Sequence, residues 1–248
     1  MEGTPRAQEP PVGRLRKFLA ILFTLAFAAA AAGALAAAYA LWRLPSLQSL
    51  PARVHAELRA QGGRWVPLSA VAPGLVTALV DTEDQTFWTN AGISVEGIAR
   101  SVLVDISSGR FVEGGSTLTQ QLVRDQLLSQ RKSLRRKIEE MVLAVALTRL
   151  DSKAEILALY LNQVYFGHGA YGVYQASETY FGRRPARLTL AQCTLLAGLP
   201  QAPSYLEPLR NPAAARARQA EVVGAMEARG DLTRAAGRAV LAAAWGLR

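Results

Sequence analysis

An uncharged apolar segment near the N-terminus limits what this chain can fold into. From Phe18 to Trp42, 25 consecutive residues carry no charged side chain. A helix of that length rises about 1.5 Å per residue, which is enough to cross the hydrocarbon core of a bilayer. Arg14, Arg16 and Lys17 stand immediately before it. Because basic residues favour the cytoplasmic side of a span, the sequence predicts an anchor in the inner (cytoplasmic) membrane with the rest of the chain outside the cytoplasm.

Two other interpretations of this segment are weaker. A cleaved signal peptide would find cleavage sites among the small residues from Ala34 to Ala40, but its apolar core should be only about 7 to 15 residues long. A buried core helix would need polar positions that this stretch lacks. The chain is therefore expected to divide into a basic cytoplasmic tail (1–17), a transmembrane anchor (18–42), a juxtamembrane linker (43–64) and one folded domain (65–248).

The composition of the chain limits which kinds of partner that domain is expected to bind. The formal net charge is +9, which calls for an acidic partner, and for a membrane-anchored domain anionic head groups and lipid phosphates are favoured over nucleic acid. The single cysteine, Cys193, has no partner for an intramolecular disulfide. With only two histidines in the chain, a Cys/His metal cluster is not predicted either.

Helical patterns dominate after the linker, with no period-2 strand. Pro73 suits the first turn of a helix that runs to about Thr82, and Glu83 and Asp84 follow at its C-terminal end. A carboxylate there faces the negative end of the helix dipole, which favours proton uptake; a solvated acidic helix end is the other interpretation. Further helices are expected over 95–106, from 153 to near 167, and over 173–180, 212–230 and 231–245. The connector 107–113 is either a lid or a surface loop.

A polar run at 114–121 interrupts the apolar pattern. Its sequence is Gly114-Gly115-Ser116-Thr117-Leu118-Thr119-Gln120-Gln121. Glycines permit close backbone approach to a ligand, and hydroxyls and amides bond to sugar hydroxyls and phosphate oxygens. The same residues also begin ordinary helices. From the run alone, a ligand cradle and a helix start are equally favoured.

A basic cluster occupies the next predicted helix. Glu140 lies four residues after Arg136 and three after Lys137, so the three side chains share one helix face. That face continues with apolar residues, which means that these charges border an apolar surface. Ordinary ion pairing along the helix is one explanation, and a site for phosphate oxygens is the other.

In combination, these motifs resemble the peptidoglycan glycosyltransferase family. This family is the transglycosylase module of class A penicillin-binding proteins and of their monofunctional relatives. The matching motifs are Glu83-Asp84-Gln85-Thr86-Phe87 with Gly92, then Gly114 to Gln121, then Arg136-Lys137-Ile138-Glu139-Glu140, then Ile156-Leu157, Tyr160-Leu161-Asn162 and Tyr180-Phe181-Gly182. The resemblance covers about residues 65 to 225, and the joint pattern is highly specific.

The resemblance implies a mainly α-helical, lysozyme-like glycosyltransferase domain behind one N-terminal transmembrane helix. Its cleft would polymerise lipid II into β-1,4-linked glycan strands with inversion. By similarity, Glu83 is the general base that takes the proton of the acceptor 4-hydroxyl. Glu140 assists departure of undecaprenyl pyrophosphate, directly or through a divalent cation such as Mg²⁺, and no organic cofactor is implied. The implied substrate-binding residues are Asp84, Phe87, Asn90, Ser116, Thr117, Gln120, Gln121, Arg124, Lys132, Arg136 and Lys137.

The implied partners are lipid II and the growing glycan chain, the lipids of the inner membrane, and other cell-wall synthesis proteins, and not nucleic acid. No segment after Asn211 resembles a penicillin-binding transpeptidase domain, which predicts a monofunctional enzyme or the product of a truncated gene.

Three positions depart from the family pattern. Asn90 stands where histidine is usual, Arg124 where lysine is usual and Lys132 where arginine is common. The last two keep the charge but change the geometry of the donors toward a phosphate. Asn90 predicts either a slower enzyme or a residue that simply bonds the same loop.

Two other classes of function remain as alternatives. A lytic transglycosylase or lysozyme-type enzyme would share the fold and a catalytic glutamate, but glycan cleavage has no pyrophosphate for the basic cluster to hold. The second alternative is an inactive membrane scaffold that recruits cell-wall proteins. It is considered because Asn90 departs from the family pattern.

Overall fold

The computed structural model describes residues 23–24, 45–97, 115–129, 131 and 133–248. Ser46–Arg248 forms one compact unit, separate from Met1–Pro45. The expected anchor (18–42, apart from Phe23 and Thr24), the connector 107–113, Gly114 and Lys132 lie outside the described residues. Within the described ranges, none of the helices combines the length and the apolar character needed to span a membrane.

The compact unit is built from helices, as the sequence predicts. The α-helices are α2 (Leu50–Ala60), α3 (Pro73–Glu83), α5 (Leu118–Leu127), α6 (Leu134–Leu150), α7 (Lys153–Gln163), α8 (Gly172–Phe181), α9 (Leu190–Gly198), α10 (Pro212–Arg229) and α11 (Arg234–Ala242), and the short 3₁₀ helices are η1 (Leu47–Ser49), η2 (Leu68–Ala70), η3 (Pro185–Arg187) and η4 (Leu199–Gln201). The β-structure among the described residues is one isolated antiparallel bridge between Tyr165 and Tyr171.

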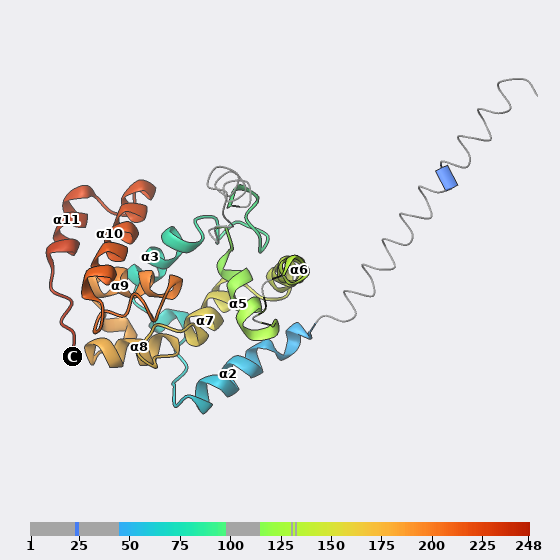
Figure 1. Ribbon diagram of the computed structural model, residues 1–248, viewed down its shortest axis with the longest axis horizontal. Helices are drawn as coiled ribbons and strands as arrows, with labels where there is room; N and C mark the ends of the chain where they lie inside the picture. Colours follow the sequence, from blue (N-terminus) through green and yellow to red (C-terminus); the bar gives the residue numbers. More distant parts are fainter. Residues whose placement is uncertain (1–22, 25–44, 98–114, 130, 132) are drawn as a thin grey trace, which may run out of the picture. The chain divides into compact units, whose positions relative to one another are not determined.

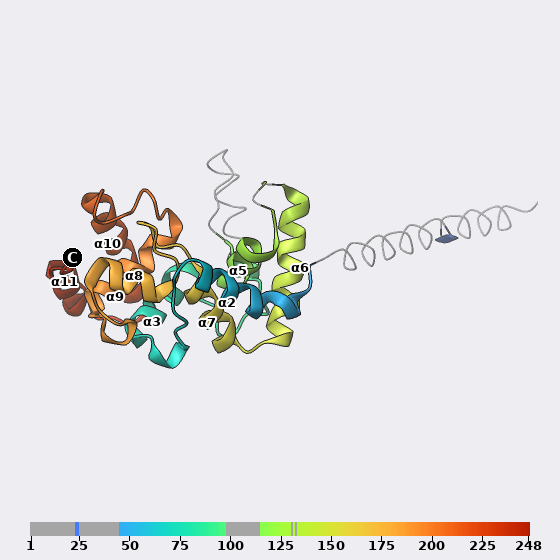
Figure 2. The same cartoon turned by 90° about the horizontal axis from the view of Figure 1, so that it is seen from below.

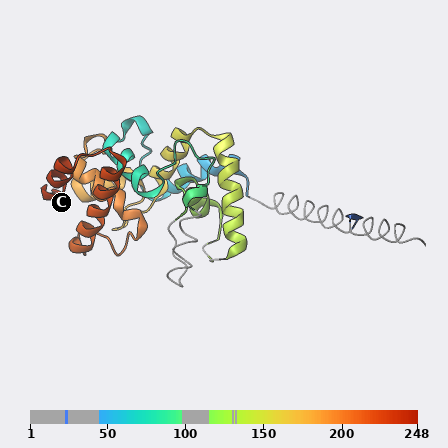
Figure 3. The same ribbon diagram turned by 90° about the horizontal axis from the view of Figure 1, so that it is seen from above.

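The helices form two packed groups. Helices α3, α9 and α10 pack against one another, with α11 against α10, while α5 packs on both α6 and α7. Figure 1 shows α10 and α11 at one end of this unit and α6 at the other, and the views from below (Figure 2) and above (Figure 3) agree. The C-terminal end of α3 and the beginning of α5 therefore meet between the two groups, where Asp84 accepts a hydrogen bond from the Leu118 backbone.

Local signals explain where several helices begin and end. Helix α7 opens with a capping box, in which Ser152 and Glu155 bond to each other's backbone N–H groups. Asn211 caps α10, and Gly230 ends it with a left-handed φ of 83°. Helix α11 is shorter than the predicted 231–245, because Thr233 caps it. The helix expected over 95–106 begins at Val95, and its residues from 98 onward lie outside the described part of the chain.

The segment 43–64, expected to be a linker, contributes a packed helix. Leu50, Val54 and Leu58 of α2 are buried, and α2 packs on α7 and α5. Burial of each such side chain stabilises the fold by about 1.5–3 kcal/mol. The compact unit therefore begins at Ser46 and includes α2.

Gly92 sets how closely the loop after α3 approaches α6. Its φ is +95°, and a Cβ built there would lie 2.3 Å from the carbonyl oxygen of Ala144. The backbone thus requires glycine both for its conformation and for its contact with α6.

We expect Gly92→Ala to destabilise the protein far more than Gly169→Ala. Gly169 also has a positive φ, of +72°, but a Cβ there would meet nothing within 4 Å. The strain of a positive φ, about 1 kcal/mol, is common to both variants. The collision with Ala144 should cost Gly92→Ala about 2 kcal/mol more. Urea denaturation measures both values, and equal losses would show that the contact with α6 does not matter.

Asp81 is a buried carboxylate on α3. Its side chain is 5% exposed, and the nearest cation, Arg229 Nε, lies 3.9 Å from Oδ1. Burial, followed by the neighbouring carboxylate of Asp231, raises the pKa of Asp81 from an ordinary 3.8 to about 6. The folded protein therefore holds a proton on Asp81 at pH values where the unfolded chain has released it.

This pKa shift makes stability depend on pH. The contribution is fully present below pH 3.8 and is lost as the pH rises through about 6. We expect Asp81→Asn to remove this dependence and to be about 1–3 kcal/mol more stable than the wild type at pH 7.5. Urea denaturation at pH 3.5 and 7.5 tests this expectation. A change of the same size at both pH values would contradict it.

Candidate active site

Glu83, the last residue of α3, is held by two neighbours from distant elements. The guanidinium of Arg218 on α10 lies 3.2 Å from Oε1, and the amide of Gln121 on α5 donates to Oε2 at 3.1 Å. Gln121 is itself oriented by Tyr160, whose hydroxyl donates to its oxygen at 3.1 Å. The side chain of Glu83 is only 13% exposed, and these contacts hold its position.

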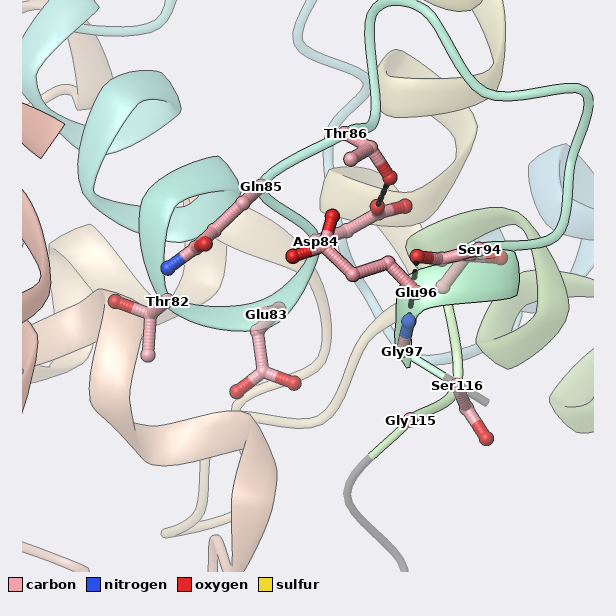
Figure 4. Close-up of a pocket in the computed structure, with 11 residues that line it drawn as sticks. Thr82, Glu83, Asp84, Gln85, Thr86, Ser94, Glu96, Gly97, Gly115 and Ser116 are labelled. Atoms are coloured by element: carbon pink, nitrogen blue, oxygen red, sulfur yellow. Dashed lines mark hydrogen bonds between the residues drawn. The ribbon is translucent and has the colours of Figure 1, made fainter. Parts of the chain in front are cut away.

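The adjacent carboxylate, Asp84, faces the opposite direction (Figure 4) and has a structural role. It accepts hydrogen bonds from the Leu118 backbone N–H at 3.1 Å, from the Asn90 amide at 2.9 Å and from the Thr86 hydroxyl at 3.3 Å. Burial raises the pKa of Asp84, although these hydrogen bonds and Lys153 oppose the change. Because Asp84 sits at the N-terminus of α5, the helix dipole also favours its charged form.

Asn90 connects three parts of the site. Its amide nitrogen donates to Asp84, while its oxygen accepts from the backbone of Gly92 at 2.9 Å. The same oxygen accepts from Lys153 Nζ at 2.8 Å. Asn90 thus bonds the loop after α3 to the first turn of α7, which is the second of the two outcomes expected for this position. Lys153 also lies 4.8 Å over the ring of Phe87.

The structure confirms the helix start in the 114–121 run, and the ligand cradle stays a prediction. Thr117 caps α5 and forms a capping box with Gln120, and both side chains are buried. Ser116 and Gln121 instead reach the charged groups, because Ser116 accepts from Lys137 at 2.6 Å and Gln121 contacts Glu83. Phe87, expected among the substrate-binding residues, is fully buried.

Glu140 anchors the basic cluster from inside α6. It is 1% exposed and accepts from Gln120 at 3.0 Å. Lys137 pairs with one of its oxygens, and Arg136 lies 3.5 Å from the other. Arg136 Nε is buried without a hydrogen-bond partner among the described residues. A buried guanidinium with an unused donor is suited to binding an anion.

Glu83, Asp84, Ser116 and Thr117 line a narrow polar cleft of about 60 Å³ (Figure 4). Glu83 lies on one side of it and Ser116 on the other, and Glu96, which the sequence analysis did not single out, also lines it. Since Ser116 bonds to Lys137, the cleft joins the Glu83 carboxylate to the cations around Glu140.

The structure does not bring every predicted residue to this cleft. The guanidinium of Arg124 is paired with its neighbour Asp125 at 2.7 Å, although it interacts electrostatically with Glu140. Lys132 lies outside the described residues. The residues that sequence reasoning missed are Arg218, Lys153, Tyr160 and Glu96. Arg218 is 135 residues from Glu83, so no local spacing signals their contact.

The surroundings of Glu140 do not fit a divalent cation. Its two oxygens already pair with Lys137 and Arg136, whose positive charge would repel a second cation. Nowhere in the described ranges do three His, Cys, Asp or Glu side chains gather in a way that could hold a metal.

Comparison with known proteins extends the motif resemblance to most of the chain. A family model described as transglycosylase matches residues 52–227. A protein from Cupriavidus necator, named as a transglycosylase, is 39% identical over 206 residues, which cover 82% of this chain and 86% of that protein. The resemblance inferred from the motifs is confirmed.

Penicillin-binding proteins 1A are also similar, over a part of their length. The Escherichia coli protein is 42% identical over 181 residues, covering 71% of this chain and 21% of that protein. The Aquifex aeolicus protein is 39% identical over 181 residues, covering 73% of this chain and 25% of that one. The chain thus spans about a quarter of the length of these relatives.

We expect Asn90→Ala to lower the free energy of unfolding by about 1–3 kcal/mol. The substitution leaves Asp84 without one donor and Lys153 without its acceptor, and partly buried groups that lose their partners are costly. Thr89→Ala is the matched control, because the Thr89 hydroxyl makes one exposed hydrogen bond. Urea denaturation compares the two variants. An Asn90→Ala protein as stable as Thr89→Ala would show that this network is dispensable.

Proposed function

Because the chain belongs to the transglycosylase family and carries the peptidoglycan glycosyltransferase domain that it shares with penicillin-binding proteins 1A, we propose that it polymerises lipid II into glycan strands. One observation carries this proposal. Glu83, a carboxylate held by two neighbours, lines the cleft together with Ser116, and Ser116 bonds to Lys137 of the cationic cluster that also contains Arg136. Forming a glycosidic bond from a pyrophosphate donor needs a base for the acceptor hydroxyl and a separate anion site for the leaving group.

Glu83 acts as the general base. The hydroxyl at position 4 of the acceptor sugar loses its proton to a Glu83 oxygen as the hydroxyl oxygen attacks the anomeric carbon of the donor. Arg218 and Gln121 each contact one oxygen of Glu83. These contacts fix the direction of the carboxylate. A β-1,4 bond forms, the α-linked carbon–oxygen bond to pyrophosphate breaks, and the anomeric carbon inverts.

The basic cluster receives the departing charge. Lys137 bonds to Ser116 at the cleft, and Arg136 keeps an unused donor. Both are suited to phosphate oxygens of the leaving undecaprenyl pyrophosphate. Glu140 holds these two cations in place and keeps their mutual repulsion low. This mechanism uses side-chain cations where a metal ion would otherwise act.

We further propose that segment 18–42 anchors the domain in the inner membrane, with the lysozyme-like catalytic unit on the outer side. A polyprenyl substrate stays in the bilayer, so an anchored enzyme encounters it by diffusion within the plane of the membrane. The uncharged length of this segment and the basic residues before it support this arrangement. The lipids of that membrane and other cell-wall synthesis proteins are then the natural partners.

Replacing Glu83 by glutamine tests the reaction. We expect Glu83→Gln to lower the rate of polymerisation by at least ~100-fold, because an amide cannot accept the proton. Glu139→Gln is the matched control, since Glu139 pairs with Arg135 on the exposed face of α6, and it should keep the rate within about twofold. The polymerisation rates of both variants are measured with the full-length protein in liposomes. Labelled lipid II is the substrate, and the products are separated on a gel.

Other outcomes would overturn the proposal. Release of anhydro or reducing-end fragments from sacculi, without polymer from lipid II, would assign the protein to glycan cleavage. No polymer above the Glu83→Gln background across several detergents and metal conditions would assign it to a scaffold role.

A further inference from the structure

A buried tyrosine on α7 lies behind Gln121. Tyr160 is fully buried, and the residues of α7 from Ile156 to Asn162 are all buried. Helix α7 packs against α5, which carries Gln121 (Figure 1). Asn162 exchanges two hydrogen bonds with the backbone of Val66, both at 2.8 Å. The Tyr160 ring therefore has a fixed place in the core, from which its hydroxyl reaches Gln121.

The Tyr160 hydroxyl favours one orientation of the Gln121 amide. It donates a hydrogen bond to Gln121 Oε1 at 3.1 Å. Burial, followed by the negative charges of Glu83 and Asp125, raises the pKa of Tyr160 well above its ordinary value of 10, so the hydroxyl keeps its proton. If the amide were turned around, its nitrogen would face the hydroxyl, and the phenolic hydrogen would lose its acceptor. A buried donor without an acceptor is costly.

The carboxylate on the other side of the amide favours the same orientation. Gln121 Nε2 donates to Glu83 Oε2 at 3.1 Å, and an ionised carboxylate can only accept hydrogen bonds. With the amide turned around, its oxygen would face a carboxylate oxygen, and the two would repel each other. Tyr160 and Glu83 thus select the same one of the two amide orientations, which are nearly identical in shape.

The other neighbour of Glu83 needs no such orienting residue. Arg218 Nη2 lies 3.2 Å from Glu83 Oε1. A guanidinium carries N–H donors on all three of its nitrogens and has no acceptor, so every orientation of it presents a donor. The amide of Gln121 presents a donor in only one orientation. The contact at Glu83 Oε2 therefore depends on what lies behind Gln121, and the contact at Oε1 does not.

We propose that Tyr160 is a positioning residue for the transfer reaction: its hydroxyl keeps the Gln121 amide nitrogen toward Glu83 and so aims Glu83 Oε2 at the acceptor hydroxyl. This inference rests on the proposed function. Tyr160 is fully buried, so it acts through Gln121 and does not touch the substrate. Without the hydroxyl, the amide is free to turn, and one oxygen of the base is no longer held.

Replacing Tyr160 by phenylalanine tests this inference, with Tyr180→Phe as the matched control. Tyr160→Phe keeps the ring, and we expect kcat for lipid II polymerisation to fall about tenfold while KM changes by less than about twofold. Tyr180 is also fully buried, but its hydroxyl donates to the Phe166 carbonyl at 2.9 Å. Tyr180→Phe removes a buried hydrogen bond of the same kind and should keep kcat within about twofold.

A double-mutant cycle shows whether Tyr160 acts through Gln121. Gln121→Ala removes the amide that Tyr160 orients, so adding Tyr160→Phe should lower kcat by less than about twofold in that background. Equal factors for Tyr160→Phe in the two backgrounds would overturn the inference. An equal loss of kcat in Tyr160→Phe and Tyr180→Phe would overturn it as well, because it would assign Tyr160 a purely structural role.

The side-chain amide of Gln121 gives a readout that does not need polymerisation. NMR of its ¹⁵N–¹H resonances in the full-length protein in detergent micelles, assigned by their loss in Gln121→Ala, should show a shift when Glu83→Gln removes the carboxylate. In Tyr160→Phe the same substitution should leave these resonances nearly unchanged, because the amide nitrogen no longer faces residue 83.

The NMR outcomes separate this inference from the proposed function. An equal response to Glu83→Gln with and without the Tyr160 hydroxyl would overturn the inference. If Tyr160→Phe fails to fold, the wild type still decides, since resonances that ignore Glu83→Gln would show that the amide nitrogen does not face Glu83. A wild type that shows the expected shift and polymerises no lipid II would overturn the proposed function, while the orientation of Gln121 would stand.

Discussion

The hydrogen bond from the Leu118 backbone to the Asp84 carboxylate joins the two helix groups at the point where the site forms. Asp84 follows the last residue of α3, and Leu118 is the first residue of α5. A carboxylate at a helix N-terminus is favoured by the free N–H groups and the dipole of that helix. Since Gln121 lies one turn further along α5, this single contact also brings its amide to Glu83. Displacing α5 would separate Glu83 from Gln121.

Buried polar groups around this contact hold one another in place. Lys153 reaches Asp84 through Asn90, and Gln120 connects the start of α5 to Glu140 on α6. In such a setting each charge is stable only while its partners remain. Asn90, the most conspicuous departure from the family pattern, supplies a donor and an acceptor at once. The position is thus filled by a residue that completes the network.

Sequence reasoning succeeded where the governing forces are local. The caps at Ser152 and Asn211 and the glycine at Gly230 each depend on residues a few positions apart, and the helix boundaries expected at 153, 212 and 230 agree with the structure. It missed α2, because a short segment after an apolar run resembles a linker until its buried leucines are seen against α7. It also missed Arg218, whose contact with Glu83 is set by how α10 packs on α3. The roles of Glu83 and Glu140 came from the family motifs, since neither carboxylate stands out by spacing alone.

The ion pair between Glu83 and Arg218 has a consequence for how the protein matures during translation. Its partners are 135 residues apart, and α10 leaves the ribosome after every other helix that lines the cleft. A nascent chain that ends at α9 already contains Glu83, the 115–121 segment and the α6 cations, yet it lacks Arg218. Domains fold as their sequence emerges, and distant contacts form last. The contact between Glu83 and Arg218 therefore forms only after α10 has been made and has packed on α3.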